Sequence, residues 1–217
     1  MLAQFRAKIS TLPPEQRERV RVLEGDMSHP LSHPEIAGLQ GQVDLITCAS
    51  AFVLLPDSAA REGAMKEWAK LAKRGTGRLV FDVPHEHNLR VGMVMEFVAA
   101  EVGCGLQVPS SRRWIPGEES VRWFVEGCGG WEVESIELVA QTGLGTRWFD
   151  SGQEEAVRLF EELVANEAYV SFRDVGEEVR ERAREVFVRL WKEAGGEEGR
   201  VEDVDGVYVV VARRTDD

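Results

Sequence analysis

Apolar residues along the chain fall into two kinds of run, some nearly continuous and some repeating every three or four positions. The continuous runs cover residues 20–24, 43–48 and 79–83, and they predict three strands. Strands of this kind are typical of a parallel sheet that is buried on both faces. Apolar residues at helical spacing over residues 57–74 predict a helix between the second and third strands. The order strand, helix, strand predicts an α/β fold with a parallel crossover.

The remainder of the chain continues this mixed pattern. We expect further helices over residues 1–10, 34–39, 89–102, 117–126 and 176–194. Ser151 and Glu154 have the spacing of a capping box, which predicts that another helix starts there. Residues 131–140 alternate between polar and apolar and predict a long strand, with a possible bulge, and residues 207–211 predict a final strand.

These elements lead to a definite sheet. We expect residues 43–48 and 78–83 to run parallel, because a crossover strand returns in the same direction. Residues 207–213 are expected to lie antiparallel beside 78–83, with residues 131–140 outside them as the edge strand.

Composition and charge exclude several classes of partner. With 26 basic and 38 acidic side chains the net charge is −12. An acidic chain gains little from counterion release at phosphates and is not attracted to anionic lipid, so we expect no nucleic acid and no membrane as partner. No apolar run reaches the ~18 residues of a membrane span, and the first residues show no signal peptide. The three cysteines form no C-x-x-C pair, which favours a reducing, cytoplasmic location.

Side chains with binding chemistry follow each of the three predicted parallel strands. Asp26 follows the first, Cys48-Ala49-Ser50 closes the second, and His85 with His87 follows the third. Ligands of open α/β sheets bind at the carboxyl ends of strands. A carboxylate there can accept a hydrogen bond from a ribose hydroxyl or an adenine amine, although an Asp after Gly is also a common turn residue.

The three strand regions together resemble a known family. The segments are V-R-V-L-E-G-D-M from residue 20, V-D-L-I-T-C-A-S-A-F-V-L-L-P-D from residue 43, and W-A-K-L-A-K-R-G-T-G-R-L-V-F-D-V-P from residue 68. They are similar to class I S-adenosylmethionine-dependent methyltransferases over roughly residues 1–85. The resemblance implies a Rossmann-like, mostly parallel sheet with an antiparallel closing strand. It also implies S-adenosylmethionine as cofactor, with Asp26 and Met27 beside the adenine and Cys48, Ala49 and Ser50 beside the methionine part.

One part of the family pattern is missing. The family's Gly-rich G-x-G-x-G loop and the acidic residue that holds the ribose are absent, since the G-x-G patterns of the chain lie elsewhere, at residues 75–77, 103–105, 127–129 and 143–145. The resemblance therefore predicts an N-terminally truncated fold with impaired cofactor binding. Three outcomes are open for residues 20–24: direct pairing with residues 43–48, strands supplied by a homodimer or other partner chain, or poor packing of the first ~40 residues. Direct pairing is expected, because it satisfies both strand edges with the shortest loop.

The methyl acceptor is expected to be a small molecule. His85 and His87 are candidate general bases, although solvated loop histidines are a simpler alternative. Zinc is not expected, because no cysteine pair completes the histidine spacings, and Cys48 is expected to be a buried, inert thiol. Aromatic residues that either line a substrate cavity or pack in the core are Phe52, Trp114, Trp148 and Tyr169. We expect one methyltransferase-like domain over residues 1–217 with a helical cap inserted at 147–200. The alternative is a non-catalytic binding or interaction module, or a fragment.

Overall fold

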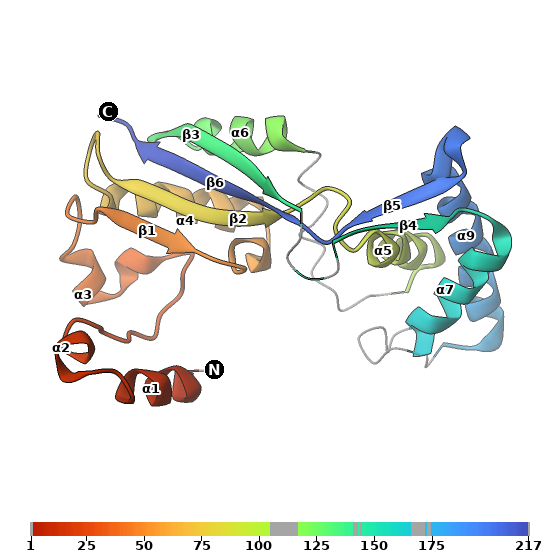
Figure 1. Ribbon diagram of the computed structural model, residues 1–217, viewed down its shortest axis with the longest axis horizontal. Helices are drawn as coiled ribbons and strands as arrows, with labels where there is room; N and C mark the ends of the chain where they lie inside the picture. The colour runs from red at the N-terminus through yellow and green to blue at the C-terminus, as the bar shows by residue number, and fades with distance from the viewer. Residues whose placement is uncertain are drawn as a thin grey trace.

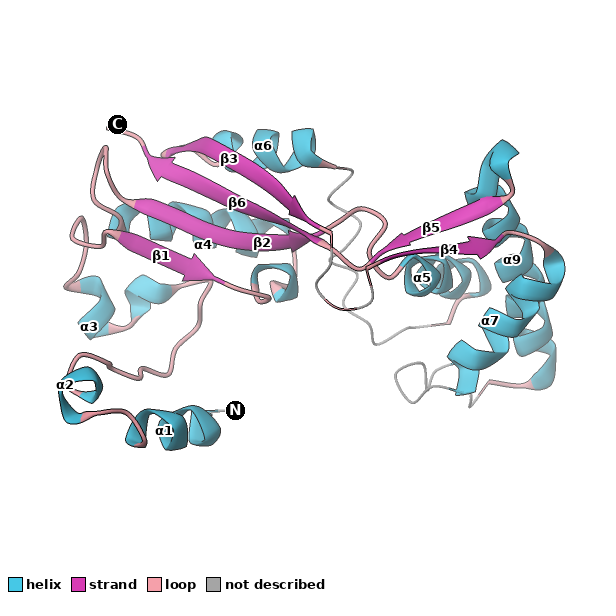
Figure 2. Cartoon of the chain, viewed as in Figure 1, coloured by secondary structure: helices cyan, strands magenta, loops and turns pink. Residues whose placement is uncertain are grey.

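The structure, a computed structural model, describes residues 2–104, 117–140, 143, 145–165, 172 and 175–216. Helices and two sheets form two groups of elements that share a narrow connection (Figures 1 and 2). The helices are α1 (Leu2–Ser10), α2 (Pro14–Arg17), α3 (Pro34–Ala37), α4 (Ser58–Leu71), α5 (Arg90–Val102), α6 (Glu118–Gly127), α7 (Gln153–Ala165) and α9 (Glu177–Gly195). The strands are β1 (Leu45–Cys48), β2 (Arg78–Pro84), β3 (Trp131–Val139), β4 (Thr146–Asp150), β5 (Arg200–Val204) and β6 (Val207–Arg214).

The main sheet has four strands in the order β1-β2-β6-β3. β1 runs parallel to β2, and β6 lies antiparallel between β2 and β3. A bulge interrupts β3 between Val133 and Ser135. The predicted strand order, strand directions and α/β class are confirmed. This part of the sheet contains one parallel pairing and two antiparallel pairings, because β6 closes it.

A crossover unit, β1-α4-β2, forms the Rossmann-like centre of this sheet. The Asp57 side chain caps α4 by accepting a hydrogen bond from the Ala60 N–H at 2.8 Å. Gly77 makes the turn into β2, and an added Cβ there would lie 2.6 Å from the Lys73 backbone nitrogen. Only glycine fits this close approach. Helices α4 and α6 cover one face of the sheet, and the fully buried Phe52 lies at the centre of the resulting core.

The prediction of a strand at residues 20–24 is wrong. The structure shows no strand there, so direct pairing with β1 is wrong. β1 is only four residues long, so its edge offers few backbone partners to a neighbouring strand. Leu23 instead lines a cavity described below, where it is partly buried. The predicted helix at 34–39 is shortened to α3.

A second hydrophobic cluster lies apart from the main sheet. The antiparallel pair β4 and β5 packs with α5, α7 and α9 around Met95, Phe160, Phe187 and Trp191. Trp191 donates its indole N–H to the Asp150 carbonyl oxygen at 2.9 Å, which fixes α9 to β4. The predicted helices α5, α7 and α9 are confirmed, whereas β4 and β5 were not anticipated. No helix in the described part of the chain has the length and apolar character needed to span a bilayer.

The two groups of elements meet at one joint, formed by residues 85–90 and residues 203–206. The His85 N–H donates to the Gly206 carbonyl at 3.0 Å, and the Val204 N–H donates to the His87 carbonyl at 3.1 Å. Asp203 is 1% exposed and accepts hydrogen bonds from the Arg90 N–H, at 2.8 Å, and from the Arg147 guanidinium. This buried carboxylate therefore ties α5 and β4 to β5.

Candidate functional site

A cavity of about 410 Å³ lies beside the carboxyl end of β1. It brings together Asp26, Met27, Cys48 and Ala49, four of the five residues expected to bind the cofactor. Its further walls include Leu23, His29, Pro30, Ser32, His33, Ile36, Ile46, Thr47 and Trp68. Most of this lining is apolar, with a few polar groups, which is the usual composition of a small-molecule site.

The loop that carries Asp26 is fixed to helix α4. The Trp68 indole N–H donates to the Met27 carbonyl oxygen at 3.2 Å. Directly before Trp68 in α4, the Glu67 carboxylate accepts from the Leu31 N–H at 3.0 Å and lies 3.6 Å from His29 Nδ1. These contacts hold the loop in place over the cavity. Sequence reasoning missed both Glu67 and Trp68, which the helical pattern marked only as parts of α4.

Asp26 has one carboxylate oxygen that is already bound and one that is available. Its Oδ1 accepts hydrogen bonds from the Ser28 N–H at 2.8 Å and the Ser28 hydroxyl at 2.6 Å. These bonds hold the pKa of the Asp26 carboxyl below its usual range, so the group is ionised at neutral pH. Its Oδ2 accepts no hydrogen bond from any residue that the structure describes. The carboxylate can therefore accept a hydrogen bond from an amine or hydroxyl in the cavity.

The segment after β1 is held in a strained turn. Ser50 has a φ of 51°, which is a left-handed conformation that non-glycine residues rarely adopt. Its N–H donates to Asp82 Oδ1 at 2.6 Å, and this bond from β2 stabilises the turn. Cys48 is buried, and its burial raises the pKa of the thiol, as an inert cysteine requires. Ser50 is not part of the cavity lining, and Asp82 is a supporting residue that sequence reasoning missed.

The two candidate bases lie at the joint and not at the 410 Å³ cavity. His85 Nε2 is 3.4 Å from Glu86 Oε2, which also accepts a hydrogen bond from the Tyr208 hydroxyl at 2.7 Å. Burial lowers the pKa of His85, so its imidazole is neutral at pH 7 and can accept a proton. His87 Nδ1 lies 2.8 Å from Glu202 Oε2. The carboxylate therefore orients the ring and leaves Nε2 as the atom that can exchange a proton.

A second cavity, of about 260 Å³, lies at this joint. Its lining includes His87 and Trp148, one candidate base and one candidate substrate residue, together with Arg90 and Arg200. The Arg200 guanidinium lies 5.2 Å from the centre of the half-exposed Trp148 ring. The structure thus brings these two predicted site residues together, away from the predicted cofactor residues.

The other aromatic candidates occupy different places. Phe52 packs against Phe81 and Trp68, with ring centres 4.9 and 5.8 Å away, and lines neither cavity. Trp114 and Tyr169 lie outside the described residues. Within the described ranges, no three His, Cys, Asp or Glu side chains are placed to hold a metal ion.

Comparison with known proteins gives a limited result. No known family matches the chain, and no curated protein matches it. Among solved structures, a loganic acid methyltransferase with SAH is similar at 14% identity and a TM-score of 0.48, covering 97% of this chain and 71% of that one. The Haemonchus contortus phospholethanolamine N-methyltransferase 2, in complex with phosphomonomethylethanolamine and S-adenosylhomocysteine, is similar at 12% identity and a TM-score of 0.36. That match covers 82% of this chain and 35% of the other. Similarity of this strength does not identify an activity.

Proposed function

We propose that the 410 Å³ cavity binds the adenosine part of S-adenosylmethionine or S-adenosylhomocysteine, and that the chain derives from an enzyme that methylates a small molecule. One observation carries the proposal. Asp26 and Met27 come from one loop and Cys48 and Ala49 from another, and both loops line the same cavity at a strand end. These are the positions at which the methyltransferase resemblance implies cofactor contacts.

The lining of the cavity suits an adenosine. A volume of about 410 Å³ lies within the range of small-molecule sites. Leu23, Ile36 and Ile46 supply apolar surface for a purine, and the free Oδ2 of Asp26 supplies an acceptor for its amine or for a ribose hydroxyl. Trp68 closes the wall beneath Met27.

The chemistry would need little from the protein beyond positioning. S-adenosylmethionine supplies an activated methyl group on its sulfonium when it is bound. Catalysis then depends on orientation and on exclusion of water, with a general base where the acceptor is a hydroxyl or a carbon acid. We assign that role to His85 or His87, and we assign the contacts to the acceptor to Trp148 and to a cap over residues 147–200. The three free thiols fit a reducing, cytoplasmic setting.

Transfer is proposed to be impaired in this chain. The 217 residues contain no G-x-G-x-G loop, and Asp26 is the one carboxylate among the described residues that line the cavity. The same observation favours a second candidate function, a non-catalytic module that retains a nucleoside-sized cavity. Both candidate functions use the same cavity, so the first experiment measures ligand binding to it.

Isothermal titration calorimetry of the 217-residue chain with S-adenosylhomocysteine tests the proposal. We expect weak binding, and we expect Asp26→Ala to weaken it at least about fivefold, because a hydrogen-bond acceptor in the site is lost. Asp44→Ala is the matched control, since Asp44 is an exposed aspartate outside the cavity. Lack of any binding at millimolar ligand would contradict the cofactor proposal. Micromolar affinity would contradict the proposed impairment, and an equal affinity of the Asp26→Ala variant would remove Asp26 from the site.

A further inference from the structure

Among the residues that the structure describes, helices cover one face of the main sheet and leave the other face uncovered. α4 and α6 lie behind the sheet in Figure 1, on the side of the hydrophobic core. The opposite face carries Val80, Val207, Val209 and Val211, which the register of β2 and β6 places side by side. All four valines are partly exposed. We call these four residues the open face. Sheets of α/β proteins normally bury such valines beneath another element.

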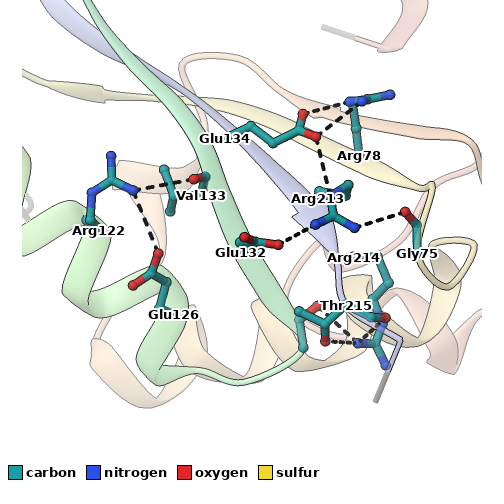
Figure 3. Close-up of polar contacts among 11 residues, drawn as sticks. Gly75, Arg78, Arg122, Glu126, Glu132, Val133, Glu134, Arg213, Arg214 and Thr215 are labelled. Atoms are coloured by element: carbon teal, nitrogen blue, oxygen red, sulfur yellow. Dashed lines mark hydrogen bonds and ion pairs between the residues drawn. The ribbon is translucent and has the colours of Figure 1, made fainter.

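Charged residues surround the open face, and most of them are acidic. Glu134 forms ion pairs with Arg78 and Arg213, and Glu132 pairs with Arg213, at one end of the sheet (Figure 3). Asp82 and Glu137, both directly opposite Val209, have no cationic partner among the described residues. The middle of the open face is therefore apolar with a negative border.

The N-terminal arm of the chain, residues 2–21, has the complementary properties. Within residues 3–21 no side chain is buried, and Phe5 on α1 is 50% exposed. Phe5 and Ile9 are one helical turn apart and form an apolar stripe on α1. Residues 1–21 contain five basic and two acidic side chains, a net charge of +3, while the rest of the chain carries −15.

Helix α1 needs a surface to pack against. It has nine residues, whereas isolated helices shorter than about 12–15 residues are only marginally stable in water. In the structure the arm lies apart from the sheet, and an exposed ion pair between Arg21 and Glu35 links it to α3. The arm thus has an exposed apolar stripe and a positive charge. The open face has an exposed apolar surface and a negative border.

We propose that the chain forms a symmetric homodimer in which α1 of each copy packs on the open face of the other. Phe5 and Ile9 would cover the valines of the open face, and Arg6 and Lys8 would lie near Asp82 and Glu137. When two copies exchange the same segment, the assembly is complete with two chains. Each arm then covers the open face of the other copy, so both open faces are buried. The proposal concerns an interface outside the 410 Å³ cavity and does not depend on methyl transfer.

Sedimentation velocity on the full chain measures the expected dimer. We expect a mass of two chains at tens of micromolar protein, and dissociation as salt is raised, because the attraction between exposed charges is screened. The double variant Phe5→Glu, Lys8→Glu should be monomeric at the same concentration, with unchanged circular dichroism. Leu54→Glu is the matched control, because Leu54 is an exposed leucine outside both surfaces and its replacement should leave the dimer intact.

Disulfide trapping identifies the contact itself. Phe5→Cys and Val209→Cys proteins, each also carrying Cys104→Ser, are mixed and oxidised, and we expect a disulfide between the two different chains. A wild-type monomer throughout the concentration range would overturn the proposal. So would an intramolecular disulfide as the main product of the doubly substituted chain, because the arm would then lie on its own sheet. The proposal would also be overturned by a dimer that persists in the Phe5→Glu, Lys8→Glu variant and gives no disulfide between the Phe5→Cys and Val209→Cys chains.

Discussion

Removal of the Asp203 carboxylate should be among the most destabilising changes at the joint. Asp203 is 1% exposed, and its two oxygens accept hydrogen bonds from the Arg90 N–H and the Arg147 guanidinium. In Asp203→Ala both donors lose their acceptor. A hydrogen bond to a charged group contributes about 1.5–3 kcal/mol, so two such bonds set an upper estimate of about 6 kcal/mol.

The expected loss is smaller because one partner reaches solvent. The Arg147 side chain is 37% exposed, so water can replace part of its bond to Asp203. The Arg90 N–H at the start of α5 makes a partly buried bond to the same carboxylate and loses its acceptor in the variant. We therefore expect Asp203→Ala to lower the free energy of unfolding by about 3 kcal/mol. Asp203→Asn keeps an acceptor for the Arg90 N–H and should cost about half as much.

Urea unfolding followed by circular dichroism measures these differences. Asp44→Ala is the control, because Asp44 forms an exposed ion pair with Lys73 and its loss should change the free energy of unfolding by about 0.5 kcal/mol or less. The slope of the unfolding free energy against urea should stay constant across the series. A loss below about 1 kcal/mol for Asp203→Ala would refute the reasoning that this buried carboxylate holds the joint together.

Three further changes have definite expected outcomes. Gly77→Ala should destabilise the protein by about 1–3 kcal/mol in urea unfolding, because the new Cβ would overlap backbone atoms. Gly127→Ala should not destabilise it, because the space around Gly127 is open. Equal stability of the two variants would contradict the overlap at Gly77. Burial lowers the pKa of His85 in the folded state, so the unfolded chain binds more protons below pH 6.5 and the free energy of unfolding should fall there. The variant His85→Gln should reduce this pH dependence. If the free energy of unfolding of the variant changed between pH 7 and 5 as much as that of the wild type, His85 would not be its cause. Burial raises the pKa of Cys128 to about 11, so a thiol reagent at pH 8 should modify the partly exposed Cys104 first. Peptide mapping measures the order of labelling, and faster labelling of Cys128 would contradict the prediction.

The main sheet could be predicted because its strands have strong local patterns. The apolar run before Ser50 and the alternation in β3 each determined one element, and the crossover rule then determined their directions. The segment at residues 20–24 shows where this reasoning stops. A strand also needs a neighbour, and β1, with four residues, offers few backbone partners along its edge. β4 and β5 could not be predicted for a related reason, since each is short, charged and paired with a partner about fifty residues away.

Part of the candidate site could also be predicted from the sequence. Asp26, Cys48 and Ala49 meet at one cavity because loops at strand ends converge. His85 and His87 follow a strand end as well, but the chain turns there through Leu89, whose φ is 51°, into α5 and the joint. Their distance from the cavity depends on this turn, which no local sequence pattern encodes.

The position of β6 has a consequence for synthesis of the protein. β6 is the latest element of the main sheet along the chain, yet it lies between β2 and β3 and supplies the backbone partners of both. During translation β2 emerges more than a hundred residues before β6, so a nascent chain exposes two apolar strand edges until its last strand has left the ribosome. Pairing over such separations is slow, because loop closure precedes any gain from contacts. The completed sheet therefore forms only after β6 has been synthesised, and binding of a chaperone to these edges during translation would protect the protein from aggregation.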